Sequence, residues 1–283
     1  MLGKIATRVA DRIRGPLRLI RNHIMPGNAR RFPELSPELT TKGIVMKAPP
    51  LTKEMVRAIR WIVPQLRYRL TRDERSRGFW ELDQNAACWG EYAVLSKYVL
   101  QAPRPAKILE IGPGTGRSVI FFTKKFGWEE AEFHLYEGDV GKSTNLRKLK
   151  RCPMGGPRFD SFYGSIPLLK QMLEFNGIRN YRVFNAREIP YANLPGPYGI
   201  IYSFHAIGFH WSLEHFIDEI AGLMDDGTLA FFIVHDNFTE FEKLKRFNYR
   251  IERYLAAFPK GWIRKMLVVS KGKIPDQLGG SRR

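Results

Sequence analysis

The chain has 283 residues, 44% of them hydrophobic, which is enough for a large buried core, yet no apolar run reaches the roughly 20 residues of a membrane-spanning helix. Its two cysteines, Cys88 and Cys152, exclude a disulfide framework and a zinc cluster, and the lack of a secretory signal favours a reducing, cytoplasmic setting. The net charge is +18, and residues 1–75 supply +11 of it (17 basic, 6 acidic). Residues 76–239 supply −1 (17 basic, 18 acidic), and residues 240–283 supply +8 (12 basic, 4 acidic). The two ends of the sequence are therefore basic and favour anionic partners.

Residues 1–25 predict a basic amphipathic helix. Their apolar side chains recur every three or four residues, which is helical spacing, and the basic side chains lie largely off that stripe. The stripe consists of Leu2, Ile5, Val9, Ile13, Leu17, Ile20 and Ile24. Gly15 and Pro16 bend or interrupt the helix. Three roles stay open: packing on the main domain, peripheral contact with an anionic membrane surface, or a transit peptide.

Residues 26–104 are interpreted as a linker and a helical cap. Prolines and weak periodicity indicate a linker over 26–51, whereas helical patterns cover 52–69 and 79–100. Several aromatic rings in or near the cap could wall a substrate pocket, or could instead pack the helices on the domain that follows. These aromatic residues are Trp80, Trp89, Tyr92 and Trp211.

Over residues 105–275 strands alternate with helices, which predicts an α/β fold with a mostly parallel sheet and helices on both faces. Strands are predicted over 107–111, 132–136, 181–184, 199–203, 228–234 and 262–270. Helices are predicted over 117–126, 166–175, 213–224 and 240–258. Only one strand is therefore expected after Phe258, and residues 276–283 read as a flexible tail.

The strongest chemical signal is the loop between the first strand and the next helix, Glu110-Ile-Gly112-Pro113-Gly114-Thr115-Gly116. Glycines lack Cβ atoms, so a nucleotide-like ligand can approach the backbone. A dinucleotide loop reads G-x-G-x-x-G, whereas this loop reads G-x-G-x-G, and the carboxylate of Glu110 would repel a pyrophosphate. The cationic methionine part of S-adenosylmethionine (SAM) suits such a carboxylate. A nicotinamide-dependent dehydrogenase is the weakest alternative.

Residues 110–116 match, without gaps, the E/D-x-G-x-G-x-G motif of the class I SAM-dependent methyltransferases, which the chain resembles over about residues 105–235. The resemblance implies a Rossmann-like methyltransferase fold with SAM as the cofactor. It also implies that Glu110 lies beneath the loop and helps to position the amino-acid end of SAM. The residues implied to line the methionine and ribose of SAM are Gly112, Pro113, Gly114, Thr115 and Gly116.

The resemblance implies further cofactor-binding residues at the ends of the next strands. Glu137 would accept hydrogen bonds from the ribose hydroxyls, with Asp139 as the alternative. Asn185, followed by Ala186, stands where the family usually has an Asp near the adenine, and its amide offers both a donor and an acceptor. Ser203, at the end of the fourth strand, would face the transferred methyl group.

Histidines follow the fourth and fifth strands, where a catalytic base is expected. A hydroxyl nucleophile benefits from a base, and histidine is suited to that role near neutral pH. His205 is the first candidate, and His235 together with Asp236 is the second, while a structural role for each histidine stays open. Asp236 and Asn237 resemble part of the metal site of the catechol-type O-methyltransferases, but the Asp that this site also needs after the fourth strand is missing, so no metal is expected.

These features predict O-methylation of a small-molecule, sugar or lipid-linked acceptor. The basic N-terminal helix and residues 140–159, an acid-free basic stretch that is either a lid or a solvated loop, suggest an anionic acceptor near a membrane. One alternative is an RNA methyltransferase that binds phosphates through its basic flanks, although nucleic acid is the less favoured partner. Another is a non-catalytic methyltransferase-like protein associated with a membrane.

Overall fold

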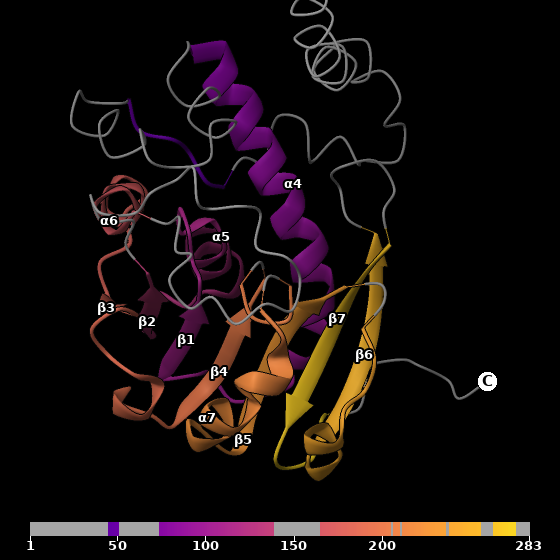
Figure 1. The fold of residues 1–283 in the computed structure, drawn as a ribbon. Coiled ribbons are helices and arrows are strands. Elements are labelled where there is room, and N and C mark those ends of the chain that lie inside the picture. Colours follow the sequence, from indigo (N-terminus) through magenta and orange to yellow (C-terminus); the bar gives the residue numbers. More distant parts are fainter. Residues whose placement is uncertain are drawn as a thin grey trace, which may run out of the picture. The chain divides into compact units, whose positions relative to one another are not determined.

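The computed structural model describes residues 45–50, 74–138, 165–204, 206–209, 211–235, 238–255 and 263–275, all within a unit that extends from Ile44 to Arg283 (Figure 1). Several predicted features lie outside the described residues. They are the N-terminal helix, the helix over 52–69, the basic stretch 140–159, the tail 276–283, His205 and Asp236.

Seven strands form one mixed sheet in the order β3-β2-β1-β4-β5-β7-β6 (Figure 1). They are β1 (Lys107–Ile111), β2 (Glu132–Glu137), β3 (Tyr181–Asn185), β4 (Tyr198–Ser203), β5 (Met224–Val234), β6 (Asn248–Leu255) and β7 (Ile263–Ser270). Strands β1 to β5 pair in parallel, whereas β7 runs antiparallel to both β5 and β6. The order of the first five strands is that of a Rossmann-like sheet, whose ligands bind where the parallel strands end. We call this side of the sheet the carboxyl edge.

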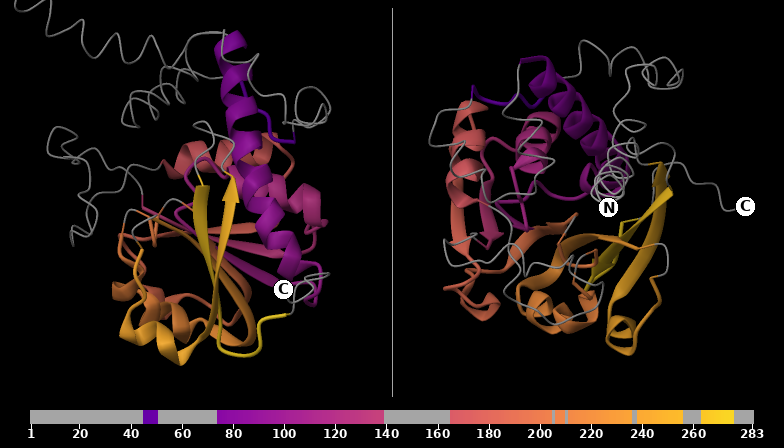
Figure 2. Two further views of the ribbon diagram at one scale, coloured as in Figure 1. Left: turned by 90° about the vertical axis from the view of Figure 1, so that its right-hand side faces the viewer. Right: turned by 45° about the horizontal axis from the view of Figure 1, so that its top comes forward.

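Helices cover both faces of the sheet (Figure 2). One hydrophobic cluster joins the sheet to α4 (Glu74–Val99), α5 (Arg117–Phe126) and α6 (Ile166–Phe175). The other cluster joins it to α7 (Ile217–Gly222) and to the short 3-10 helices η3 (Tyr191–Asn193), η4 (Leu213–His215) and η5 (Glu242–Arg246). No helix in the described ranges combines the length and apolarity required to cross a membrane. The arrangement confirms the predicted α/β fold with helices on both faces.

Helices α5 and α6 begin and end where the sequence predicts, because local signals fix their ends. Gly116 and Gly127 flank α5 with φ values of 73° and 67°, a left-handed conformation that favours glycine. Ser165 caps α6 by accepting a hydrogen bond from the amide of Leu168 at 3.3 Å, and a proline occupies the first turn. The ends of both helices are therefore set by residues next to them in the sequence.

The helix predicted over 240–258 is wrong. The short η5 occupies part of this segment, and β6 follows it, paired with β7 over eight consecutive register positions. The mixture of charged and apolar residues in β6 looks like a helical pattern. It is also compatible with a strand, because the side chains of β6 alternate between two faces of the sheet. The chain therefore ends in an antiparallel hairpin rather than in one strand. Residues 213–224 also differ from the single predicted helix, because they form η4, α7 and the start of β5.

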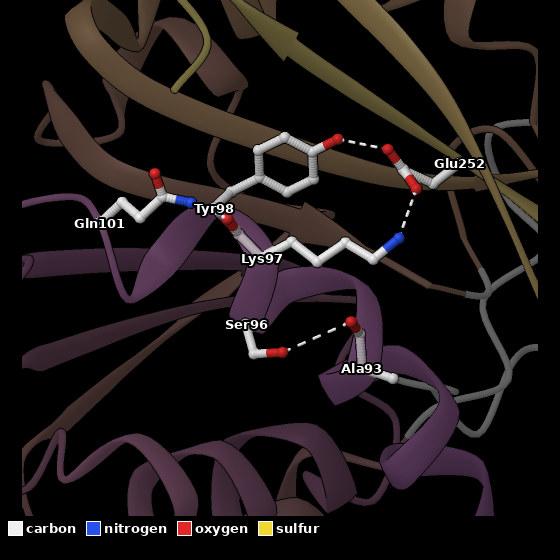
Figure 3. A network of polar contacts seen from close by, with 6 residues as sticks. All are labelled: Ala93, Ser96, Lys97, Tyr98, Gln101 and Glu252. Carbon is white, nitrogen blue, oxygen red and sulfur yellow. Dashed lines mark hydrogen bonds and ion pairs between the residues drawn. The ribbon is translucent and has the colours of Figure 1, made fainter. Parts of the chain in front are cut away.

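Polar contacts fasten the hairpin to α4 (Figure 3). The carboxylate of Glu252 in β6 accepts a hydrogen bond from the Tyr98 hydroxyl and lies 2.8 Å from Nζ of Lys97. Tyr98 is fully buried, and its ring lies against that of Phe231 in β5. The face of the hairpin that carries Glu252 is thus covered by α4.

A short strap over residues 45–48 is held by side chains from two helices. Oδ1 of Asn85 accepts hydrogen bonds from the amides of Val45 and Met46 at 2.8 and 3.0 Å, and its Nδ2 donates to the Met46 carbonyl at 3.0 Å. Asn176 forms the same kind of pair with the backbone of Lys47, at 2.9 and 2.8 Å. The two asparagines therefore act as hydrogen-bonding partners for this extended backbone.

Candidate active site

The glycine loop lies at the carboxyl edge, between β1 and α5. Gly112, Gly114 and Gly116 have φ values of 71°, 59° and 73°, which other residues rarely adopt. A Cβ atom at Gly112 would lie 2.4 Å from Cβ of Ala206, and one at Gly116 would lie 2.9 Å from the side chain of Leu169. At Gly114 nothing lies within 4 Å of that position. The outer glycines are thus required by packing, whereas the middle one faces open space that a ligand can enter.

Glu137 lies against the backbone of this loop. Its Oε2 accepts a hydrogen bond from the amide of Gly114 at 2.8 Å, and its Oε1 accepts one from the amide of Gly138 at 3.0 Å. The side chain is buried, with 7% of the residue exposed. In the loop itself Pro113 is buried and Thr115 is half-buried. The acid at the end of β2 is therefore in direct contact with the glycine loop.

Glu110 is buried in β1, directly before the loop. Only 2% of the residue is exposed, and Oε1 accepts a hydrogen bond from the hydroxyl of Ser118 in α5. Burial raises the pKa of Glu110 to about 8, although the hydrogen bond from Ser118 opposes the shift. At neutral pH the carboxyl is therefore mostly uncharged. The role implied for Glu110 toward the amino-acid end of SAM stays a prediction. The acid that reaches the loop backbone is Glu137.

A buried ion pair next to Glu110 was not predicted. Nη2 of Arg117, the first residue of α5, lies 2.5 Å from Oε1 of Glu91 in α4, and both side chains are at least 90% buried. Nη1 of Arg117 also lies 3.6 Å from the sulfur of Cys88. Burial raises the pKa of Glu91, and the charge of Arg117 opposes that rise. The pair attaches α4 to the residue that follows the glycine loop.

Asn185 and Ala186 lie beside Glu137, because Asn185 pairs with Glu137 in the β2–β3 register. The amide of Ala186 donates to the Glu137 carbonyl at 2.9 Å. The side chain of Asn185 is engaged within its own turn, where Oδ1 accepts from the amide of Arg187 at 3.1 Å and Nδ2 donates to Glu188 at 2.7 Å. The structure thus brings three predicted cofactor positions to one side of the glycine loop.

Ser203 is fully buried at the end of β4. Its hydroxyl donates to the Ile111 carbonyl at 2.9 Å and accepts a hydrogen bond from the amide of Ile207 at 2.9 Å. The hydroxyl therefore joins the ends of β1 and β4, and its position beside the predicted methyl site is set by these contacts.

His235 follows β5 at the same edge. Its Nε2 lies 2.7 Å from the carbonyl oxygen of Phe209, and its ring stacks on the Phe209 ring with centroids 4.2 Å apart. The guanidinium of Arg264 in β7 lies over the same phenyl ring, 5.5 Å from its centroid. Because β4 separates β1 from β5, His235 is about 10 Å from the glycine loop along the edge, two strand spacings away. A half-buried histidine is thus oriented by the main chain close to the loop.

Two aromatic residues of α4, Trp89 and Tyr92, pack on α5, whereas the side chain of Trp80 lies outside the described residues. The Trp89 ring lies edge-on to Phe121, with centroids 5.2 Å apart, and the Tyr92 ring lies 4.7 Å from that of Phe126. Both partners belong to α5, so these rings hold α4 on the domain. Among the described residues no group of three or more His, Cys, Asp or Glu side chains could hold a metal ion.

Comparison with known proteins finds likeness in structure but not in sequence, since no protein-family model and no curated sequence matches the chain. Magnesium protoporphyrin IX methyltransferase from Synechocystis PCC 6803, solved with bound SAM, is 12% identical, with a TM-score of 0.46 and coverage of 80% of this chain and 100% of that chain. A SAM-dependent methyltransferase from Aquifex aeolicus is 11% identical, with a TM-score of 0.43 and coverage of 68% and 96%. A spermidine synthase in complex with a transition-state analogue is 17% identical, with a TM-score of 0.43 and coverage of 66% and 62%.

These likenesses concern the fold alone, and the assignment of the fold rests on the features described above. The five parallel strands follow the Rossmann-like order, and the glycine loop follows β1 at the carboxyl edge. The antiparallel hairpin β6–β7 completes the sheet. The described domain therefore has the Rossmann-like fold of the class I methyltransferases.

Proposed function

We propose that this chain is a SAM-dependent methyltransferase that transfers a methyl group to an oxygen atom of a small-molecule, sugar or lipid-linked acceptor. The observation that carries the proposal is the hydrogen bond from the Gly114 amide to the carboxylate of Glu137. In a dinucleotide site, backbone amides of the loop and helix start receive the pyrophosphate. A carboxylate at that amide disfavours a diphosphate and favours a ligand with hydroxyl groups and a cationic amino-acid end.

The residues around the loop fit SAM. The open space above Gly114 would admit the methionine and ribose, and Glu137 would accept hydrogen bonds from the ribose hydroxyls. Asn185 and Ala186, beside Glu137, would lie near the adenine. When bound, SAM supplies a methyl group attached to a sulfonium, which is a good leaving group. The main task of the protein is then to align the acceptor oxygen and to remove its proton.

His235 is the base that the described residues favour. A carbonyl oxygen only accepts, so the contact with Phe209 places a hydrogen on Nε2, and in the neutral ring Nδ1 is left with the lone pair. An acceptor hydroxyl bound to Nδ1 would lose its proton as its oxygen attacks the methyl group. His205 and Asp236, outside the described residues, remain candidates for the same task.

Calorimetry tests the cofactor directly. We expect saturable binding of SAM and of its demethylated product, S-adenosylhomocysteine, and no binding of NAD. Glu137→Gln keeps the shape of the side chain but removes its charge, so we expect it to weaken SAM binding. Glu130→Gln, at an exposed position before β2 and away from the loop, serves as the control. Saturable binding of NAD, or no binding of SAM at millimolar concentration, would refute the proposal.

The acceptor class can be tested with SAM labelled in its methyl group. The full chain would be incubated with separate small-molecule, lipid and RNA fractions of a cell extract. Label in the small-molecule or lipid fraction supports the proposed acceptor class, and its release as methyl iodide by hydriodic acid supports a methyl group bonded to oxygen rather than to nitrogen or carbon. Label in the RNA fraction alone, with binding that weakens steeply as salt is added, would replace it with the RNA methyltransferase alternative.

A further inference from the structure

The hairpin β6–β7 has two faces with different surroundings. Glu252 and its neighbours of the same parity face α4, which covers them (Figure 3). Ile251 and Arg253 point to the other face, and Arg253 pairs in register with Lys265. Ile263 lies two residues before Lys265 and therefore shares that face. We call Ile251, Arg253, Ile263 and Lys265 the hairpin patch.

The hairpin patch combines exposed apolar side chains with basic ones. Ile251 is 39% exposed and Ile263 is 55% exposed, and only two other large apolar residues in the described ranges, Leu100 and Phe175, are exposed to this degree. Half of such residues thus lie on one face of one hairpin. None of the four patch residues is acidic, and Glu240 lies farther along the same face, at Tyr249. In the sequence, residues 256–262 between the two strands likewise hold no acid, although they lie outside the described residues and the patch does not include them.

The patch lies at the carboxyl edge of the sheet. Strand β7 runs antiparallel to β5, and Lys265 pairs with Val234, the last residue of β5. Ile263 therefore lies beyond the end of β5, near His235. Figure 1 shows β6 ending at the same side of the sheet as the arrowheads of β1 and β4. A surface that contacts the patch would thus be close to the proposed catalytic residues.

We propose that the hairpin patch docks the domain on an anionic phospholipid surface. Apolar side chains enter the boundary between headgroups and acyl chains, and flanking Arg and Lys are attracted to anionic headgroups. Nucleic acid would use the basic side chains but gives exposed isoleucines nothing to bury against. The chain's net charge of +18 agrees with an anionic target. Because the patch lies at the carboxyl edge, docking there favours a lipid-linked acceptor. This inference about the acceptor rests on the proposed methyltransferase function.

Vesicle flotation of the full chain tests the docking. We expect binding to vesicles of equimolar phosphatidylcholine and phosphatidylserine and much weaker binding to phosphatidylcholine alone. Ile251→Ser with Ile263→Ser should lower the partition coefficient by about tenfold, since both exposed apolar side chains are lost. Arg253→Gln with Lys265→Gln should lower it by about twenty-five-fold at low salt, at roughly fivefold for each charge.

Leu100→Ser with Phe175→Ser is the matched control. These residues follow α4 and end α6, just before β1 and β3 begin, so they lie at the opposite edge of the sheet. We expect this variant to bind vesicles like the original chain. Three results would each overturn the docking proposal. The first is a loss in the control variant equal to that in the patch variants, and the second is binding that is lost only when residues 1–25 are deleted. The third is a salt-insensitive dimer that depends on Ile251 and Ile263 and does not bind vesicles.

SAM calorimetry on the same variants separates the two proposals. The patch variants should bind SAM as the original chain does, because none of the substituted side chains touches the glycine loop. Loss of vesicle binding with intact SAM binding supports docking through the patch. Failure of the original chain to bind SAM would refute the proposed function while vesicle binding is still measured independently.

Discussion

The two ends of the carboxyl edge are built differently. At the glycine loop the polar groups are buried and paired with one another: Glu110 with Ser118, Glu91 with Arg117, and Glu137 with the amide of Gly114. Beyond β5 the half-buried His235 contacts a backbone carbonyl and a stacked ring among the described residues. The first region is suited to hold a ligand in a fixed position, because its charges are already oriented. The second contains the histidine that we propose as the base, with its Nε2 at the Phe209 carbonyl.

The largest expected effect tests the second region. His235→Gln places an amide near Nε2 that can still donate to the Phe209 carbonyl, but it removes the base. We expect methyl transfer to fall by about 10²–10⁴-fold while SAM affinity changes little. Labelled transfer to the acceptor fraction and calorimetry measure the two quantities. His215→Gln, at an exposed position in η4, is the control, and unchanged transfer in His235→Gln would show that another residue acts as the base.

The buried ion pair makes the first region sensitive to substitution. Glu91→Ala leaves the guanidinium of Arg117 buried without its partner, so we expect the free energy of unfolding to fall by about 3–5 kcal/mol. Lys97→Met breaks a pair with Glu252 that is much more exposed on the lysine side and should cost less than about 1 kcal/mol. Urea denaturation measures both. Equal losses would mean that the pair at Arg117 contributes no more than a surface pair.

The glycines distinguish packing from ligand space within the loop. Gly114→Ala has room for its methyl group and should cost only about 1–2 kcal/mol of stability, through its left-handed φ, but should weaken SAM binding by at least about tenfold. Gly112→Ala collides with Ala206 and should lower stability much further. Thermal unfolding and SAM calorimetry separate the two effects, with Gly222→Ala as the control. Normal SAM binding by Gly114→Ala would place the ligand elsewhere.

The smallest expected effect concerns the charge of Glu110. The folded state retains a proton that the unfolded state releases, so stability is full below the ordinary carboxyl pKa and falls as pH rises through about 8. Glu110→Gln should therefore remove part of the decrease in the free energy of unfolding with pH. Burial also raises the pKa of Glu91, so Glu91 should account for the rest of that decrease. Denaturation at pH 6 and at pH 9 checks the difference. Identical slopes in both proteins would show that Glu110 is ionised in the fold.

Local signals explain which elements the sequence predicts correctly. Ser165 and the proline after it begin α6, and glycines flank α5, so both helices have the predicted bounds. The segment 240–258 lacks such signals. Part of this segment forms β6 because it pairs with β7, which follows it in the sequence. The alternation of apolar and polar residues in β6 is hard to recognise, because charged residues lie on both faces. Pairing with a distant strand outweighs local propensity here.

The candidate site is predicted in part for the same reason. The glycine loop and Glu137 follow strand ends, and parallel strands end at one edge, so their proximity can be expected from the strand pattern. The partners of Arg117 and His235 cannot. Glu91 lies on a helix that precedes the sheet, and the Phe209 group that contacts His235 is a backbone carbonyl, which no side-chain pattern reveals.

The strap over residues 45–48 determines where the chain can be shortened. Asn85 is 3% exposed, and its amide has the strap backbone as its partner on both sides. A truncation that begins at residue 51 would leave this buried amide without most of its hydrogen bonds, at a cost of about 1–3 kcal/mol. A truncation that begins at residue 44 preserves them. A minimal crystallisable fragment should therefore start ahead of Val45, so that the extended backbone still occupies the place between Asn85 and Asn176.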